Sequence, residues 1–267
     1  MRLRYTLLGT GSSGGVPRGD GDWGACDPAN PRNRRRRCSM LVERLPENGE
    51  GEATTVLVDT SPDLREQMLM AGVRRVDAVL YTHDHADQTH GIDDLRVFAM
   101  RQRSRIPCYM DEPTHAALAG RFGYIFESVQ GYPAICEARA LPERAFEING
   151  PSGPIPVTGF DQAHGPVRAL GYRIGGLAYS PDVSDIPDAS FEIISGASVW
   201  VVDALRYTPH PTHAHLDRTL QWIARAGVDR AWLTNLHIDM DYDSLSRLLP
   251  AHVGAGHDGL QITLDHA

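Results

Sequence analysis

Short runs of aliphatic and β-branched residues recur along the chain, separated by glycine, proline and other turn-forming residues. Runs of this length and composition are typical of buried strands. We expect strands at Leu3–Leu8, Ser39–Arg44, Thr54–Val58, Val76–Tyr81, Ile106–Tyr109, Leu170–Ile174, Leu177–Ser180, Val199–Ala204 and Ala231–Thr234.

Other stretches place apolar residues three and four positions apart, which is the spacing of one helix face. This spacing predicts helices at Pro62–Ala71, Asp93–Arg103, His115–Phe122 and Leu216–Ala226. Because helices separate only some of the strands, the pattern favours a layered α/β sandwich over a strict βαβ barrel. No repeat or linker interrupts the chain, so we expect a single domain over residues 1–267.

Composition narrows the class of protein. The 267 residues are 42% hydrophobic and 22% charged, which excludes an intrinsically disordered chain. No apolar run reaches the ~18–20 residues that a membrane span needs, and the apolar part of Met1–Gly9 is too short for a signal peptide. We therefore expect a cytoplasmic protein with no membrane partner.

Charge and cysteine content exclude further classes. The formal net charge is −8, and all 26 basic residues are arginine. An acidic chain has no overall field that attracts nucleic acid, so nucleic acid is not expected as a partner. Cys26, Cys38, Cys108 and Cys136 form no C-x-x-C pair, which indicates reduced thiols and no zinc ribbon.

A glycine-rich segment follows the first expected strand. Gly9 to Gly14 fits the pattern G-x-G-x-x-G, which in a dinucleotide-binding fold opens a helix. Here the chain continues Gly15-Val16-Pro17, which cannot propagate a helix. We expect instead a tight turn that brings backbone amides near a ligand such as a phosphate.

The strongest chemical signal is a histidine cluster directly after the strand Val76–Tyr81. It reads Thr82-His83-Asp84-His85-Ala86-Asp87. In an extended chain His83 and His85 share a side, and Asp87 adds an oxygen donor one step later. Three nitrogen and oxygen donors at a strand end are typical of a metal site.

This segment resembles the T-H-x-H-x-D-H signature of the metallo-β-lactamase fold family, matched at Thr82, His83, His85 and Asp87. The resemblance extends over nearly the whole chain and implies a four-layer αββα sandwich. Gly9–Pro17, Arg36–Ser39 and Asp59–Pro62 are similar to the branch of phosphodiesterases that open phosphoribosyl cyclic phosphates, which is more distantly related to a tRNA-processing endonuclease.

The resemblance implies six metal ligands: His83, His85 and His164 for a first ion, Asp87 and His237 for a second, and Asp182 as a bridge between them. Two such ions share a hydroxide and neutralise charge on a phosphoryl group. Asp59 resembles the family's acid that orients a ligating histidine, with a helix cap as the alternative.

Two departures from the family pattern concern the second ion. The histidine after the aspartate is replaced by Gln88, and the strand that typically ends in Thr-His ends here in Thr234-Asn235, with His237 displaced by two positions. A neutral glutamine oxygen is a weaker zinc ligand than imidazole. We therefore expect Zn²⁺ or Mn²⁺ in one tight and one weaker site. If a helix begins near Asp87, His90 points elsewhere.

Phosphodiester cleavage also needs a proton donor for the leaving oxygen. The branch places a histidine three residues before the first apolar helix residue, and His213 before Leu216 matches that spacing. His215 is the alternative for the same role. The resemblance thus implies His213, His215 and Asp182 as catalytic residues.

The sequence therefore predicts a metal-dependent phosphodiesterase that attacks a small cyclic phosphate or nucleotide-like ester with a metal-bound hydroxide. Three alternatives stay open: a hydrolase of thioesters or lactones, a relative of tRNA-processing nucleases, and a weakened metal- or nucleotide-binding protein. The expected partner is a small phosphorylated substrate, and a homodimer is left open. The basic residues Arg32 and Arg34–Arg37 form either a solvated turn or, through alternate residues such as Arg35 and Arg37, a phosphate clamp.

Overall fold

The computed structural model describes residues 1–265, and this part of the chain divides into two compact units. Unit 1 holds residues 1–8, residues 39–156 and the described residues from 261 onward. Unit 2 holds residues 9–38 and 157–260. Each unit combines segments that are far apart in the sequence, so neither is a continuous stretch. The single domain over residues 1–267 stays a prediction.

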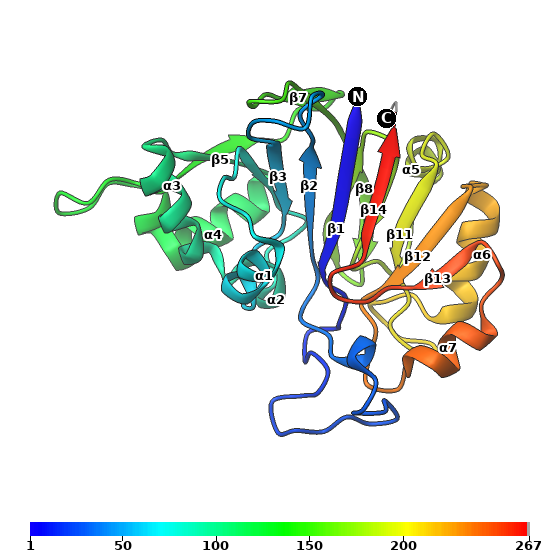
Figure 1. Cartoon of the computed structure of the whole chain (residues 1–267). Helices are drawn as coiled ribbons and strands as arrows, with labels where there is room; N and C mark the ends of the chain where they lie inside the picture. The colour runs from blue at the N-terminus through cyan, green and yellow to red at the C-terminus, as the bar shows by residue number, and fades with distance from the viewer. Residues whose placement is uncertain (266–267) are drawn as a thin grey trace. The chain divides into compact units, whose positions relative to one another are not determined.

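The first sheet has the strand order β14-β1-β2-β3-β4-β5-β6 (Figure 1). Its strands are β1 (Arg2–Gly9), β2 (Ser39–Arg44), β3 (Thr54–Val58), β4 (Ala78–Leu80), β5 (Ile106–Met110), β6 (Cys136–Ala140) and β14 (Gln261–Asp265). Strands β3 to β6 run parallel, so their carboxyl ends meet at one edge. Strands β1 and β14 are antiparallel neighbours.

The helices of unit 1 gather beside β3 and β5 in Figure 1. They are α1 (Leu64–Ala71), α2 (Ala86–Thr89), the 3₁₀ helix η2 (Ile92–Leu95), α3 (Arg96–Gln102) and α4 (Glu112–Phe126). An apolar cluster joins helices to strands through buried residues such as Leu57 of β3, Leu64 of α1, Phe98 of α3 and Leu118 of α4. None of the described helices is long and apolar enough to cross a membrane.

The second sheet has the order β13-β12-β11-β10-β9-β8-β7. Its strands are β7 (Phe146–Ile148), β8 (Ile155–His164), β9 (Val167–Ile174), β10 (Leu177–Ser180), β11 (Val199–Asp203), β12 (Arg230–Thr234) and β13 (Val253–Ala255). Strands β8, β9 and β10 form an antiparallel meander, and β10 to β13 run parallel.

The helices of unit 2 are the 3₁₀ helix η1 (Pro31–Asn33), α5 (Asp188–Ile194), α6 (Leu216–Ala226) and α7 (Tyr242–Leu248). Helices α5, α6 and α7 bury an apolar face around Trp200 of β11, whose side chain is fully buried. Phe191 of α5, Ile223 of α6 and Leu245 of α7 belong to the same cluster. This core fixes the strands whose ends carry the site.

The expected strands and helices are present, with shifted ends. Helix α4 is longer than His115–Phe122 because Asp111 caps it, accepting a hydrogen bond from the Thr114 N–H at 3.0 Å. The sequence missed β6, β7, β8, β13, β14, α5 and α7. Most of these are short or mix exposed with buried positions; α7, for example, buries only Leu245.

The glycine-rich segment after β1 is fixed by close backbone contacts inside unit 2. Gly11 donates from its N–H to the Arg36 carbonyl at 2.8 Å. A Cβ at position 11 would lie 2.9 Å from the Arg35 Cβ, so only glycine fits there. The Asp258 carboxylate accepts from the N–H groups of Thr10 and Arg36 at 3.0 and 2.8 Å. The segment therefore forms a fixed turn, and no helix begins there.

The loop that follows is anchored by Arg35, which is only 2% exposed. Its Nη2 donates to the Met240 carbonyl at 2.7 Å, and its Nη1 lies 3.6 Å from Cys26 Sγ. Arg35 is therefore neither a solvated turn residue nor a phosphate ligand. Trp23 packs against a small cluster that includes Cys26. All four cysteines are buried free thiols, as the sequence indicated.

The core of unit 1 gives a stability prediction from two leucines. Leu57 is fully buried, whereas Leu69 is 63% exposed. We expect Leu57→Ala to lower the free energy of unfolding by ~2–5 kcal/mol, because it leaves a cavity, and Leu69→Ala to change it by less than ~0.5 kcal/mol. Urea denaturation followed by circular dichroism measures both. Equal losses would show that Leu57 does not lie in a packed core.

Candidate metal and phosphoryl-transfer site

In unit 1 the residues expected to bind metal, and the acid that supports them, follow two neighbouring parallel strands, β3 and β4. The ends of β3 and β4 pair with each other, so Asp59 and Thr82 emerge at the same edge. The Asp59 carboxylate accepts hydrogen bonds from the N–H and the hydroxyl of Thr82, both at 2.8 Å. Asp59 has a φ of 62°, a left-handed conformation that aspartate tolerates better than most residues. It does not cap α1, whose N-terminal cap is Asp63.

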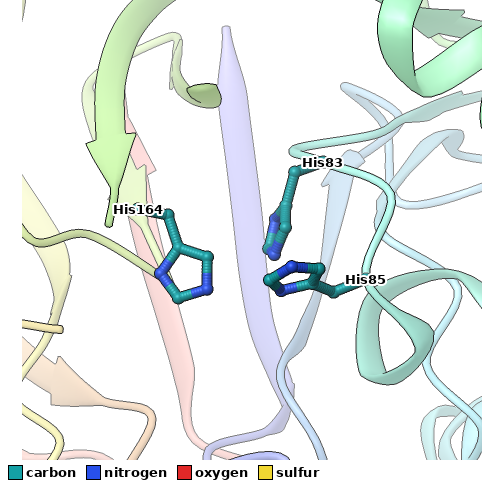
Figure 2. A group of neighbouring side chains, drawn as sticks. All are labelled: His83, His85 and His164. Atoms are coloured by element: carbon teal, nitrogen blue, oxygen red, sulfur yellow. The ribbon is translucent and has the colours of Figure 1, made fainter. Parts of the chain in front are cut away.

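This pair sets the orientation of His83, which is 1% exposed. The Thr82 hydroxyl oxygen lies 3.0 Å from His83 Nδ1. Because the hydroxyl hydrogen goes to Asp59, the oxygen accepts from Nδ1–H, and Nε2 carries the lone pair that a metal requires. The His85 ring lies edge-on to the His83 ring, with centroids 4.5 Å apart (Figure 2). Burial raises the pKa of Asp59 to about 8, while the hydrogen bonds from Thr82 act to lower it.

In unit 2 three buried polar residues lie at the carboxyl ends of three neighbouring parallel strands. The paired ends of β10, β11 and β12 bring Asp182, Asp203 and Asn235 to one edge. The Asn235 amide nitrogen donates to Asp182 Oδ1 at 3.1 Å and to Asp203 Oδ1 at 3.2 Å. All three residues are at most 2% exposed. Two buried carboxylates therefore share one amide group.

Asp203 also holds His213. His213 Nδ1 donates to Asp203 Oδ2 at 2.8 Å, so Nε2 is the ring nitrogen left for chemistry. Burial raises the pKa of Asp203, and the hydrogen bond and charge of His213 act to lower it. A histidine backed by a buried carboxylate in this way is suited to donate a proton.

His164 lies at the end of β8 (Figure 2). Its ring centroid is 4.5 Å from that of His213. His164 Nδ1 donates to the Thr212 carbonyl at 2.7 Å, which again assigns Nε2 as the coordinating nitrogen. One ligand atom each from His164, Asp182 and His213 lies within 4.8 Å of the others. Buried, pre-oriented imidazole and carboxylate donors of this kind fit a divalent cation.

A pocket of about 310 Å³ opens beside this group in unit 2. It is lined by Ser12, Ser13, Gly14, Arg18, Leu205, Arg206, His210, His213 and His237. Burial lowers the pKa of His210, and the charges of His213 and Arg206 lower it further. The pocket is therefore electropositive and bordered by the backbone of the glycine-rich turn, which suits an anion.

His237 lies in this pocket rather than in the group formed by His164, Asp182 and His213. Its Nε2 is 2.6 Å from Arg18 Nη2, and its Nδ1 is 2.9 Å from an Asp239 carboxylate oxygen. A metal at His237 Nε2 would have to displace the guanidinium of Arg18. The role of His237 as a ligand of a second ion stays a prediction.

The remaining predicted residues are placed as follows. His215 is the N-terminal cap residue of α6 and does not line the pocket of unit 2. Asp87 lies in the first turn of α2, where its charge contributes to the raised pKa of Asp59. Gln88 is buried in the same helix. His90 is exposed and packs edge-on against Phe122, and it belongs to neither group of potential metal ligands found among the described residues.

Sequence reasoning missed three residues of the site. Asp203 is the last residue of β11, Asn235 follows β12, and Arg18 lies in the loop after the glycine-rich turn. Each belongs to a common residue type with no spacing motif. Only the rule that parallel strands end at one edge could have drawn attention to the first two.

The family model described as "Beta-lactamase superfamily domain" matches residues 54–238. The chain belongs to the metallo-β-lactamase superfamily. A solved diphosphatase from the PhnP family is 35% identical, with a TM-score of 0.87 over 99% of this chain and 98% of that one. These matches confirm the α/β sandwich fold of a metallo-β-lactamase-type hydrolase and the resemblance to its phosphodiesterase branch.

More distant structures show the fold alone. Zinc-bound PqqB from Methylobacterium extorquens is 17% identical, with a TM-score of 0.73 over 97% of this chain and 99% of that one.

A curated relative is similar in sequence. An octanoyltransferase of Porphyromonas gingivalis is 30% identical over 98% of this chain, but the match covers 52% of that protein. This superfamily chain therefore spans about half the length of the curated relative it matches.

The Asp59–Thr82–His83 arrangement predicts an effect on metal affinity. Thr82→Val removes the hydroxyl that positions His83 Nδ1, so we expect divalent metal to bind ~10–100-fold more weakly. Thr55→Val, at the opposite end of β3 from Asp59, is the matched control and leaves the affinity unchanged. Competition with a chromogenic chelator measures both dissociation constants. Unchanged affinity in Thr82→Val would show that this hydroxyl does not orient a ligand.

Proposed function

We propose that this protein is a metal-dependent phosphodiesterase that acts on a small cyclic phosphate or nucleotide-like ester. One divalent cation, Zn²⁺ or Mn²⁺, is held tightly by His83, His85, His164 and Asp182. When bound, the cation supplies Lewis-acid polarisation of the phosphoryl group and an activated water. Two observations support this ligand set: its resemblance to the superfamily's ligand positions, and the hydrogen bonds that turn Nε2 of His83 and His164 outward from their supporting groups.

A second cation binds more weakly in this proposal, with Asp87 and His237 among its ligands. Gln88 stands where the family has a histidine, and Arg18 already occupies His237 Nε2. Both features weaken a second site relative to the first.

The observation that carries the phosphodiesterase assignment is the His213–Asp203 pair at the edge of the electropositive pocket. An alkoxide leaving group has a pKa far above 7 and departs slowly without a proton. His213 Nε2 donates that proton, while Asp203 holds the Nδ1–H and stabilises the charged ring. His215 lies outside the lining of this pocket, so His213 is the preferred donor.

The pocket also suits a phosphorylated substrate. The guanidinium of Arg206 donates to the carbonyls of Thr208 and Pro209, at 3.2 and 2.7 Å, and so fixes the loop that carries His213. Arg18 and the backbone of Ser12 to Gly14 provide donors for the phosphate oxygens. The substrate's non-reacting oxygens bind there and align its leaving group with His213.

The composition of the pocket argues against hydrolysis of a long acyl thioester. Among the described residues that line it, only Leu205 is aliphatic. An octanoyl chain would find little apolar surface to cover. A second candidate is hydrolysis of a diphosphate, because the relative at 35% identity is a diphosphatase and the same arginines suit that substrate.

Leaving-group dependence tests the role of His213 and separates the two candidates. On a ribose cyclic phosphate, we expect His213→Ala to lower kcat/KM by ~10²–10⁴-fold. On bis(p-nitrophenyl) phosphate the loss is small, because p-nitrophenolate leaves without a proton. A diphosphate, whose phosphate leaving group is also a weak base, is predicted to be nearly insensitive as well. The measurement is kcat/KM for the three substrates.

Two further variants serve as controls for this comparison. His215→Ala should leave all three substrates within a few-fold of the parent, and His85→Ala should reduce all of them alike. Equal losses for His213→Ala on every substrate would move His213 from proton donation to substrate binding. A selective loss in His215→Ala would assign the proton to that residue instead.

A further inference from the structure

Unit 2 contains an arrangement that the proposed reaction does not use. The Asn235 amide nitrogen lies between two fully or almost fully buried carboxylates, 3.1 Å from Asp182 Oδ1 and 3.2 Å from Asp203 Oδ1. His213 balances one negative charge through Asp203 Oδ2. This amide joins the two Oδ1 atoms, and His213 Nδ1 lies 3.7 Å from Asp182 Oδ1. The Asn235 amide nitrogen therefore occupies a position where both carboxylates accept hydrogen bonds.

A hydrogen-bond donor and a metal ion compete for such a point. The amide presents two polarised hydrogens, one for each carboxylate, and its assignment as nitrogen follows because both carboxylates only accept when ionised. The same nitrogen also lies 3.0 Å from His213 Nδ1, whose own hydrogen goes to Asp203 Oδ2. A divalent cation bound to the same oxygens would offer more charge, but it would have to displace both hydrogen bonds. The side chain at position 235 thus decides whether hydrogens or a cation join Asp182 to Asp203.

We propose that Asn235 is the reason that this chain holds its second cation only weakly. Its neutral amide satisfies Asp182 and Asp203, so one divalent ion binds tightly where a histidine after Thr234 would help to hold two. The inference rests on the proposed function only in treating Asp182 as a metal ligand. Asn235 is a positioning residue here, acting through the two carboxylates.

The backbone conformation of Asn235 limits which substitutions can test this proposal. Asn235 has a φ of 60°, a left-handed conformation that asparagine and aspartate adopt at low cost. Asn235→Asp keeps the shape and backbone preference but replaces two donors by a third carboxylate. The resulting cluster of three carboxylates attracts a cation more strongly than the parent cluster does.

The experiment compares the parent chain with Asn235→Asp, each titrated with Mn²⁺ and then analysed for bound metal after gel filtration. We expect Asn235→Asp to hold one equivalent more than the parent. Asn33→Asp is the matched control. Asn33 is also fully buried and donates to a carboxylate, that of Asp241, at 2.7 Å, but Asp241 belongs to neither group of potential metal ligands found among residues 1–265. It should gain no metal.

Thermal unfolding provides a second readout if Asn235→Asp is unstable without metal. Added Mn²⁺ should raise the melting temperature of Asn235→Asp more than that of the parent, because the folded variant binds the additional cation more tightly. No gain in bound metal and no larger rise in melting temperature would overturn the inference. A parent chain without any bound metal would contradict the proposed function, yet an additional equivalent in Asn235→Asp would still support the role of Asn235.

Discussion

The site depends on keeping three buried carboxylates hydrogen bonded, because an unpaired buried charge is very costly. In both units the solution uses parallel strands. Thr82, after β4, donates twice to Asp59, after β3. Asn235, after β12, donates to Asp182 and Asp203, which follow β10 and end β11. Each carboxylate thus receives at least one donor from a residue that follows a parallel strand of the same sheet.

Once the carboxylates are held, they determine what the histidines can do. Asp59 acts through a hydroxyl to set the tautomer of His83, whereas Asp203 bonds directly to His213. The first arrangement presents a lone pair, which suits a metal ligand, and the second stabilises a charged ring, which suits a proton donor. The arginines that line the pocket beside His213 suit an anionic substrate of the kind we propose. The division of labour thus follows from how each acid reaches its imidazole.

The sequence predicted the parts of the molecule that local pattern determines. The two histidines after β4 could be identified because a strand followed by alternating donors is rare, and the central strands because they are continuously apolar. Asp203 and Asn235 could not be predicted, since their importance comes from the pairing of strands distant in sequence. The same holds for Arg35, whose burial depends on the Met240 carbonyl about two hundred residues away. Strand β14 was missed because its residues alternate between exposed and half-buried.

The central claim is that one cation is bound by His83, His85, His164 and Asp182. Anomalous X-ray diffraction at the zinc edge, on crystals of zinc-loaded protein, tests it most directly. The account predicts a single strong peak at about 2.0–2.1 Å from the Nε2 atoms of His83 and His164. A peak bound by His213 and Asp203 instead, or two peaks of equal height, would contradict it.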